Sequence, residues 1–339
     1  MAKSLLQTQL GLSSSDPQAS LRLSQQAPSF LQSQPSRFPS FPFSIFSQKE
    51  TPELWMNYEQ LLAACLRTGD DKSARECLDR LSSRFGETNE RVMGLRGLYE
   101  EATAADDAAL KEVLNKYDAI LEENPVNVPV LKRRIAVLRS LSRHADSISS
   151  LVEFLDAFPT DAEAWCELSD LYHSQGLSSQ SIFCLEEALL ILPNAWNVSP
   201  TPFNELLNIM LNATYQLHAR LGELQYISTN TPEAPEASLK VLAESVRRFC
   251  RSIELCDNYL RGYYGLNLST ARLLERLGPK SRRDDTLPTP QTTQKLHDLS
   301  IKKLREIVKE RCEGGRSPEY NESELIAAQA LLDRLAKSG

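Results

Sequence analysis

The sequence lacks the residue patterns from which enzymes build active sites. It contains only 4 histidines, His144, His173, His218 and His297, and none of them belongs to an HExxH motif or a Cys/His cluster. We expect these histidines at the surface or at helix ends. The sequence also has no Gly-x-Ser-x-Gly elbow, no phosphate-binding glycine loop and no Gly-x-Gly-x-x-Gly turn. We therefore expect no catalytic residues, no metal and no cofactor, and a protein that is not an enzyme.

An excess of positive charge and long apolar runs are also missing. The formal net charge is −7 at pH 7, whereas binding to a phosphate backbone requires a basic surface, so no nucleic-acid partner is expected. No apolar run approaches the roughly 20 residues that cross a bilayer, and residues 1–25 contain no secretory signal. The 7 cysteines form no CxxC pair, which favours buried, reduced thiols. We expect a soluble protein that reaches membranes indirectly, through partners.

What the sequence does contain is a regular period. Pro125, Pro159 and Pro193 stand 34 residues apart, and each closes an amphipathic helical segment. A fixed period of this length is typical of a helix–turn–helix array. Each repeat of such an array buries its apolar face against its neighbours and leaves an extended binding surface. The expected fold is all-α, a right-handed α-solenoid of about five helical hairpins closed by C-terminal capping helices.

Composition divides the chain into four parts. Residues 1–48 are rich in Ser, Gln and Pro, so we expect a disordered tail. The alternative is that phenylalanines around Phe38–Phe43 dock into a groove. Residues 51–277 carry the helical periodicity of the array, residues 278–293 look like a linker, and residues 294–339 should form the capping helices.

Within the best repeat, Thr160 and Glu163 have the spacing of a capping box at the start of a helix. After Pro193 the period loosens. A loop rich in Pro, Thr and Glu is expected over 228–238. The remaining expected helices cover residues 203–221, 239–256, 259–277, 294–311 and 323–337.

The repeat that ends at Pro193 resembles the tetratricopeptide consensus. The spacing of Trp165, Leu168, Tyr172 and Gly176 matches the first helix and turn of that consensus. Such positions are structural because they fill the space between the helices of a repeat. The positions to which we assign this role are Trp55, Tyr58, Pro125, Pro159, Trp165, Leu168, Tyr172, Gly176, Leu185, Ala188 and Pro193.

Charged residues on the first helices of two repeats are candidates for partner binding. Lys132 and Arg133 begin the densest basic stretch, which either grips an acidic partner segment or is a solvated helix face, and the two readings are equally favoured. The next repeat presents acidic residues that would repel the terminal carboxylate that cochaperones bind, which argues against that function. A groove of mixed sign results. The residues expected to line it are Lys132, Arg133, Glu163, Cys166, Glu167 and Asp170.

Four longer segments carry a further resemblance, namely residues 54–64, 121–125, 162–168 and 183–187. They resemble the fungal-like members of the family of subunit 2 of the endoplasmic reticulum (ER) membrane protein complex. The likeness lies mainly within residues 54–193, and weakly in 247–266.

This resemblance implies a non-catalytic scaffold that is held peripherally at the cytosolic face of the ER membrane. Its implied partners are the transmembrane and soluble subunits of the complex, which places tail-anchored and multi-pass proteins in the bilayer. The alternative is a generic soluble tetratricopeptide adaptor that binds a peptide or loop of another complex. The likeness departs from the family at insertions near 104–107, 228–238 and 278–293.

Overall fold

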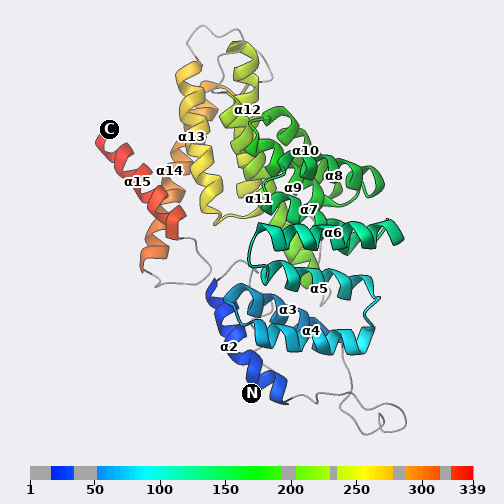
Figure 1. The fold of residues 1–339 in the computed structure, drawn as a ribbon. Coiled ribbons are helices and arrows are strands. Elements are labelled where there is room, and N and C mark those ends of the chain that lie inside the picture. Colours follow the sequence, from blue (N-terminus) through cyan, green and yellow to red (C-terminus); the bar gives the residue numbers. More distant parts are fainter. Residues whose placement is uncertain are drawn as a thin grey trace. The chain divides into compact units, whose positions relative to one another are not determined.

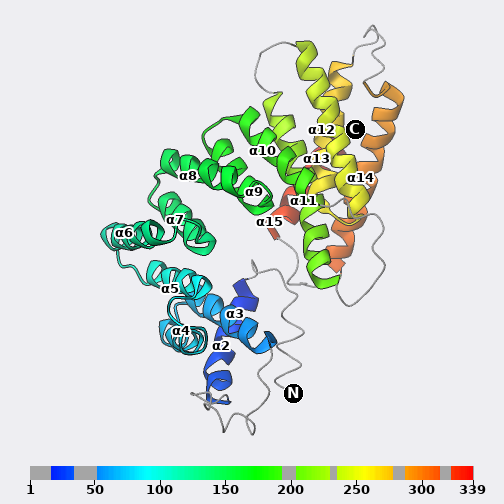
Figure 2. The same cartoon turned by 90° about the vertical axis from the view of Figure 1, so that its right-hand side faces the viewer.

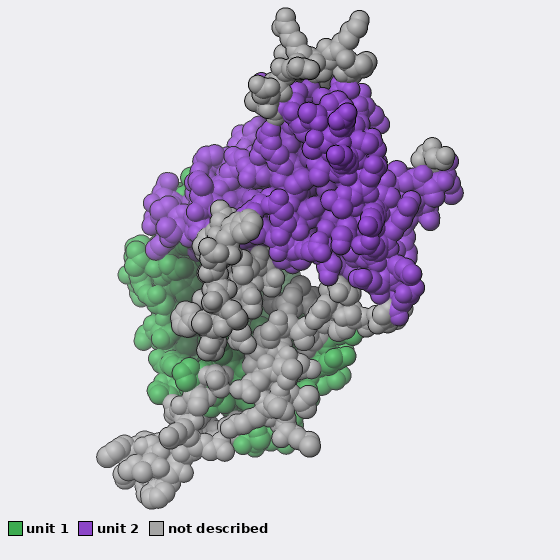
Figure 3. All heavy atoms as spheres, turned by 180° about the vertical axis from the view of Figure 1, so that it is seen from behind, with its two compact units in different colours: residues 1–154 green, residues 155–339 purple. Residues whose placement is uncertain are grey.

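All regular elements that the structure describes are α-helices, in agreement with the predicted all-α class. The chain divides into two compact units, residues 1–154 (unit 1) and 155–339 (unit 2) (Figure 3). The boundary falls inside one helix, α8. Each unit has a hydrophobic core of its own. The computed structural model describes residues 17–33, 52–192, 204–229, 235–277, 287–313 and 322–338.

Unit 1 is built from short helices, and from α3 onward tight turns join them (Figure 1). Gly69 ends the first turn with a φ of 76°, a left-handed conformation that glycine adopts without strain. Asp70 then begins α4 by accepting the amide hydrogen of Ser73 at 3.1 Å. The helices are α2 (Pro17–Ser33), α3 (Pro52–Thr68), α4 (Asp71–Phe85), α5 (Glu90–Ala102), α6 (Asp107–Glu123), α7 (Val128–Ser140) and the first part of α8 (His144–Ala157).

The helix α2 lies where the composition predicts part of a disordered tail, and that part of the prediction is wrong. Ala27 and Leu31 are buried where α2 packs on α3 and α4. Phe30 meets Tyr58 edge-on, with ring centroids 5.5 Å apart. The buried guanidinium of Arg80, on α4, donates to the Leu31 carbonyl at 2.8 Å. Tertiary contacts thus supply the stability that the composition of the segment does not indicate.

Short polar side chains cap most of the hairpin helices in both units. Asn89, Asp106 and Asn127 accept amide hydrogens at the starts of α5, α6 and α7. The predicted capping box of Thr160 and Glu163 is wrong. The helix begins at Ala162, so the cap is Asp161, which accepts the Ala164 amide hydrogen at 3.0 Å. A capping side chain must immediately precede the first helical residue, and Thr160 lies one residue too early.

Unit 2 has longer helices toward its C-terminal end (Figure 2). Helices α11, α12, α13 and α14 pack in sequence against one another. The helices are α9 (Ala162–Ser174), α10 (Ser178–Ile191), α11 (Asn204–Ser228), α12 (Pro235–Leu255), α13 (Leu260–Arg276), α14 (Pro290–Glu313) and α15 (Glu322–Ser338).

Two of these helices begin inside segments predicted to be non-helical. The expected loop over 228–238 includes the first residues of α12, and the expected linker over 278–293 includes those of α14. In both helices the first residue is a proline, Pro235 or Pro290. Proline lacks an amide hydrogen, and the first turn of a helix does not need it. The Pro-rich composition predicts a loop and a linker, whereas Pro235 and Pro290 each start a helix. The sequence also predicted α11 to end near residue 221, seven residues early.

The centre of unit 2 depends on close approach between α11, α12 and α13. Phe249 on α12 is buried against Gly265 on α13, where an added Cβ would lie 2.1 Å from its ring. The Ser245 hydroxyl donates to the Gly222 carbonyl of α11 at 2.7 Å and lies 3.1 Å from the Ser269 hydroxyl. Small residues thus bring the three helices together and fix the positions of the charged side chains at their surface.

Candidate partner-binding surface

In unit 1, alternate helices are joined by ion pairs of one polarity. Arg91 on α5 donates to Glu59 on α3 at 2.5 Å. Arg133 on α7 donates to Glu101 on α5, with Nε 2.9 Å from Oε1. The acid stands on the earlier helix and the arginine on the later one, and 32 residues separate the members of both pairs.

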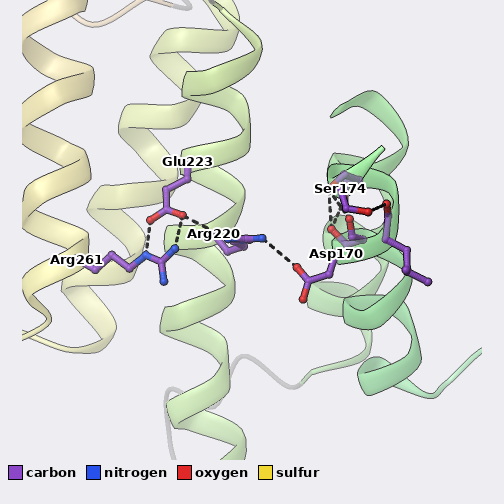
Figure 4. A network of polar contacts seen from close by, with 8 residues as sticks. Asp170, Ser174, Arg220, Glu223 and Arg261 are labelled. Atoms are coloured by element: carbon purple, nitrogen blue, oxygen red, sulfur yellow. Dashed lines mark hydrogen bonds and ion pairs between the residues drawn. The ribbon is translucent and has the colours of Figure 1, made fainter. Parts of the chain in front are cut away.

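The same polarity recurs in unit 2 (Figure 4). Arg220 on α11 donates to Asp170 on α9 at 3.0 Å. Arg261 on α13 donates two hydrogen bonds to Glu223 on α11, at 2.5 and 2.7 Å. Arg220 also lies 4.0 Å from Glu223, so the four residues form one chain of alternating charge. We call these pairs, together with Glu59–Arg91 and Glu101–Arg133, the ion-pair ladder.

The Glu101–Arg133 pair is the most deeply placed pair of the ladder. The side chain of Glu101 is 11% exposed and that of Arg133 is 29% exposed. The Tyr117 hydroxyl also donates to Glu101, at 2.5 Å. Burial raises the pKa of Tyr117, and the neighbouring charge of Glu101 raises it further. Burial opposes the charge on Arg133, but hydrogen bonds and attraction from Glu101 outweigh it and raise the pKa of Arg133. The guanidinium of Arg133 therefore stays charged at neutral pH.

The Glu223–Arg261 pair lies nearer to solvent but has good geometry. Hydrogen bonding to Glu223 raises the pKa of Arg261, against the opposing effect of burial. Two parallel hydrogen bonds between a guanidinium and a carboxylate fix orientation as well as distance. The pair therefore fixes the spacing and orientation of α11 relative to α13. It also neutralises two charges that a partner would otherwise contact.

The two basic residues predicted for the groove have different surroundings. Arg133 belongs to the ion-pair ladder, so its guanidinium is held within the chain. Lys132, beside it in the sequence, places its ammonium 5.9 Å from the centre of the Phe154 ring, within the range of a cation–π contact. Both residues belong to unit 1, whereas the predicted acidic residues belong to unit 2. A continuous groove of mixed sign remains a prediction.

The four predicted groove residues of unit 2 all lie on α9. Asp170 is exposed and is bound to Arg220. Glu163 is exposed and Glu167 is partly buried. Cys166 packs beside a cluster of buried leucines, and burial raises the pKa of its thiol to about 11. The thiol of Cys166 is therefore protonated, and its side chain contributes to packing. Glu163, Glu167 and Asp170 give α9 a negative surface.

The predicted repeat positions differ in how deeply they are buried. Gly176 forms the turn between α9 and α10 with a φ of 76°. Pro193, like the phenylalanines at 38–46, lies outside the described residues. Pro125 and Pro159 are exposed. The positions that are buried are Trp55, Tyr58, Leu168, Leu185 and Ala188.

Trp165 and Tyr172 differ from these positions because both are only partly buried. The Trp165 indole Nε1 donates to the Pro159 carbonyl at 2.9 Å. Its ring meets Phe183 edge-on at 6.0 Å, and Phe183 itself is 53% exposed. The consensus tryptophan therefore lies at the surface of the α9–α10 hairpin.

The described residues provide no grouped ligands for a metal. Nowhere in this part of the chain do three His, Cys, Asp or Glu side chains come together as a metal site would require.

His144 begins α8 and His173 lies in the last turn of α9, but the prediction of a surface or helix-end position is wrong for His218. His218 lies within α11 and is 7% exposed, because α12 packs over that face. None of the described helices combines the length and apolar composition that a bilayer crossing requires.

Sequence reasoning missed most of the ion-pair ladder. It selected Arg133 and Asp170 as partner contacts but not their own partners, Glu101 and Arg220. The 32-residue separation in unit 1 is close to one repeat and is a usable signal. In unit 2 the separations become 50 and 38 residues because the helices and connections are longer. A fixed period cannot find those pairs.

Comparison with known proteins places these repeats in a family. A family model described as the EMC2 TPR-like repeat domain matches residues 94–208. TPR repeat protein oca3 of Schizosaccharomyces pombe is 31% identical over 286 residues, which are 79% of this chain and 91% of that protein. ER membrane protein complex subunit 2 of Xenopus tropicalis is 28% identical over 285 residues, which are 84% of this chain and 82% of that protein.

A solved tetratricopeptide repeat protein from Parabacteroides merdae aligns over 83% of this chain and 99% of its own, with 17% identity and a TM-score of 0.38. The fold is all-α and of the tetratricopeptide class. The family model and the long alignments agree on one assignment. The chain belongs to the EMC2 TPR-like repeat family, the family of ER membrane protein complex subunit 2.

Proposed function

We propose that this chain is a scaffold subunit of the ER membrane protein complex. The observation that carries the proposal is the extent of the likeness to the Xenopus tropicalis subunit, which covers 84% of this chain and 82% of that protein. An alignment of that extent includes both compact units, so it is not limited to one repeat. What the two proteins share is then the array itself, and a helical array functions by presenting surfaces to other proteins.

The scaffold acts from the cytosolic face of the ER membrane, to which it is held peripherally by transmembrane and soluble subunits of the complex. In this role it supports the insertion of tail-anchored and multi-pass proteins. The ion-pair ladder suits such a role because it fixes the spacing of alternate helices within each unit before any partner binds. A preorganised surface loses less conformational entropy on binding.

The scaffold is proposed to be non-catalytic. Burial raises the pKa of the thiols of Cys65, Cys166, Cys184 and Cys250 to about 11. The thiolate is the nucleophilic form of cysteine, and at neutral pH these four groups are thiols. Proteins of the tetratricopeptide class typically bind other proteins, and the surroundings of these cysteines support the same role here.

Partner contact is proposed for Lys132, Glu163 and Glu167. Arg133 and Asp170 would have to leave ion pairs within the chain before they could contact a partner. Exchange of that kind is costly because the abandoned Glu101 or Arg220 would lose its counter-charge. The ladder residues therefore hold their helices in place, and we assign them no direct contact with a partner.

Affinity purification from gently solubilised membranes tests this proposal. The full chain, tagged at its C-terminus, is isolated in digitonin, sized under native conditions and examined by mass spectrometry. Recovery of a stoichiometric set of transmembrane subunits supports the scaffold function. Recovery of free chain, or of soluble partners alone, contradicts it and indicates an adaptor of another complex.

Protease treatment of sealed microsomes tests the proposed side of the membrane. The tag should be digested without detergent if the chain lies on the cytosolic face, while a lumenal control protein stays intact. Protection of the tag until detergent is added would contradict the cytosolic location. Carbonate extraction should release the chain, since a peripheral protein is held by other subunits and not by lipid.

A further inference from the structure

The α9–α10 hairpin carries negative charge without any lysine or arginine of its own. No basic residue other than histidine occurs between Arg143 and Arg220. Within residues 160–192 there are six carboxylates. Arginines from other helices meet Asp170 (Arg220) and Glu186 (Arg248, at 3.4 Å). The hairpin's own residues therefore carry an excess of negative charge.

The outer side of α10 is apolar as well as acidic. Phe183 is 53% exposed and Leu190 is 79% exposed. They stand seven residues apart, which is two turns, so both lie on one face of the helix. Glu186 and Glu187 lie between them at the intervening turn. We call these four residues the outer face of α10.

This face is not part of the core of the hairpin. The opposite side of α10 supplies the buried residues, including Ser181, Leu185 and Ala188. The hydroxyls of Ser181 and Ser169, on α10 and α9, form a hydrogen bond of 2.8 Å, which fixes the rotation of α10 about its axis. The helix is therefore apolar on a second side as well, where Phe183 meets Trp165 of α9 edge-on but stays half exposed and Leu190 is largely exposed. A second apolar side on an exposed helix is characteristic of an interaction surface.

We propose that the outer face of α10 binds an amphipathic helix of a partner protein, one whose apolar stripe is bordered by Lys and Arg. Phe183 and Leu190 would contact the apolar stripe, since their two-turn spacing matches the repeat of a helical partner. Glu187 would meet the basic border, where complementary charge sets orientation and partner choice.

The negative charge of the hairpin favours a basic helix over two other possible occupants of this face, a second copy of the chain and a membrane surface. A second copy of the chain, meeting the same face about a two-fold axis, would bring carboxylate against carboxylate. The cytosolic surface of a membrane is negative and would repel the hairpin. A basic amphipathic helix satisfies both the apolar and the charged residues. The inference concerns a different surface from the alternate helices that carry the ladder, so it does not depend on the proposed function.

A binding experiment with two defined peptides tests the proposal. One is a fluorescent 18-residue helix of Leu and Lys with Leu at i, i+3, i+4 and i+7, and the other has Glu in place of Lys. Fluorescence anisotropy is measured with the full chain at 0.15 M salt. The Leu/Lys peptide should bind and the Leu/Glu peptide should not, and added salt should weaken binding because the charges are exposed.

Variants of the exposed residues locate the binding. Leu190→Ser should weaken binding of the Leu/Lys peptide by at least about tenfold, because a well-exposed leucine loses its apolar contact. Glu187→Gln should weaken it about threefold. The matched control is Ile326→Ser on α15, a site that is 59% exposed, which should leave binding unchanged. Circular dichroism should show all three variants folded, since none of these side chains is buried.

Three results would overturn the proposal. The Leu/Lys peptide could fail to bind, or it could bind Leu190→Ser as tightly as the unmodified chain. The chain could also self-associate in sedimentation through a contact that Leu190→Ser abolishes, which would assign the face to a second copy. Selective loss of peptide binding in Leu190→Ser and Glu187→Gln, with Ile326→Ser unaffected, supports it.

Discussion

Glu101 on α5 binds the guanidinium of Arg133, which lies 32 residues later on α7. Glu59 and Arg91 repeat this relation one helix pair earlier, at the same separation. An acid on one repeat and an arginine on the next make each repeat depend on its neighbour for charge as well as for apolar contact. Such nearest-neighbour contacts account for the cooperativity of helical arrays.

Replacing Glu101 should reveal how much one pair of the ladder contributes. Glu101→Gln leaves the partly buried Arg133 without a counter-charge, so the free energy of unfolding should fall by about 2–3 kcal/mol. The matched control is its neighbour, Glu100→Gln, which breaks only the exposed pair with Lys116 and should cost less than about 1 kcal/mol. Urea unfolding followed by circular dichroism measures both. Equal losses would show that burial of the Glu101 pair has no energetic consequence.

The contact between Gly265 and Phe249 should not tolerate a methyl group. A Cβ at residue 265 would lie 2.1 Å from the buried ring of Phe249, so Gly265→Ala should cost about 1–3 kcal/mol through overpacking. The second variant, Phe249→Leu, removes the ring that causes the clash. In a double-mutant cycle the paired variant should lose less stability than the two single variants together. Additive losses would mean that α13 shifts freely and that the close approach is unimportant.

The acid sensitivity of the fold should depend on His218. Burial, with Arg248 and Arg251 nearby and Glu254 opposing them, lowers the pKa of His218 to about 4 from its usual 6.5. Between these values the unfolded chain binds a proton that the folded chain does not. The stabilising contribution is therefore complete above pH 6.5 and is lost as pH falls toward 4.

Urea unfolding at pH 7.5 and pH 5.0 tests this linkage. The stability difference between the unmodified chain and His218→Leu should change by about 2 kcal/mol between the two pH values. His144→Leu, at the start of α8, is the control for loss of a histidine and should keep the pH dependence of the unmodified chain. If both variants retain the same dependence, His218 is not the group responsible.

Local sequence signals predicted the helices well where each helix has its own start and stop signals. The helix expected over residues 259–277 is α13, which the structure places at Leu260–Arg276. Helix α2 could not be foreseen in this way, because its stability comes from contacts with Tyr58 and Arg80. The starts of α12 and α14 were hidden by prolines whose role depends on position within a turn.

The candidate site was less predictable than the fold. Charge on a first helix was visible in the sequence, so Arg133 and Asp170 were selected. Their partners were not, because Glu101 and Arg220 come close only when helices stack. A periodic sequence identifies which faces meet, but the pairing of long side chains depends on separations that the longer helices of unit 2 change. Sequence alone therefore could not decide between a solvated charge and an ion pair within the chain.

The two tryptophans at repeat positions should differ in their effect on stability. Trp55 is 9% exposed and packs with Tyr58 and Phe85, so Trp55→Ala should cost about 3–5 kcal/mol. Trp165 matches the consensus but is only partly buried and packs on the exposed Phe183. Less apolar surface is lost on its truncation, so Trp165→Ala should cost only about 1–2 kcal/mol. Urea unfolding of both variants measures the difference. If Trp165→Ala is as destabilising as Trp55→Ala, the surface position of Trp165 is wrong and the consensus core assignment is right.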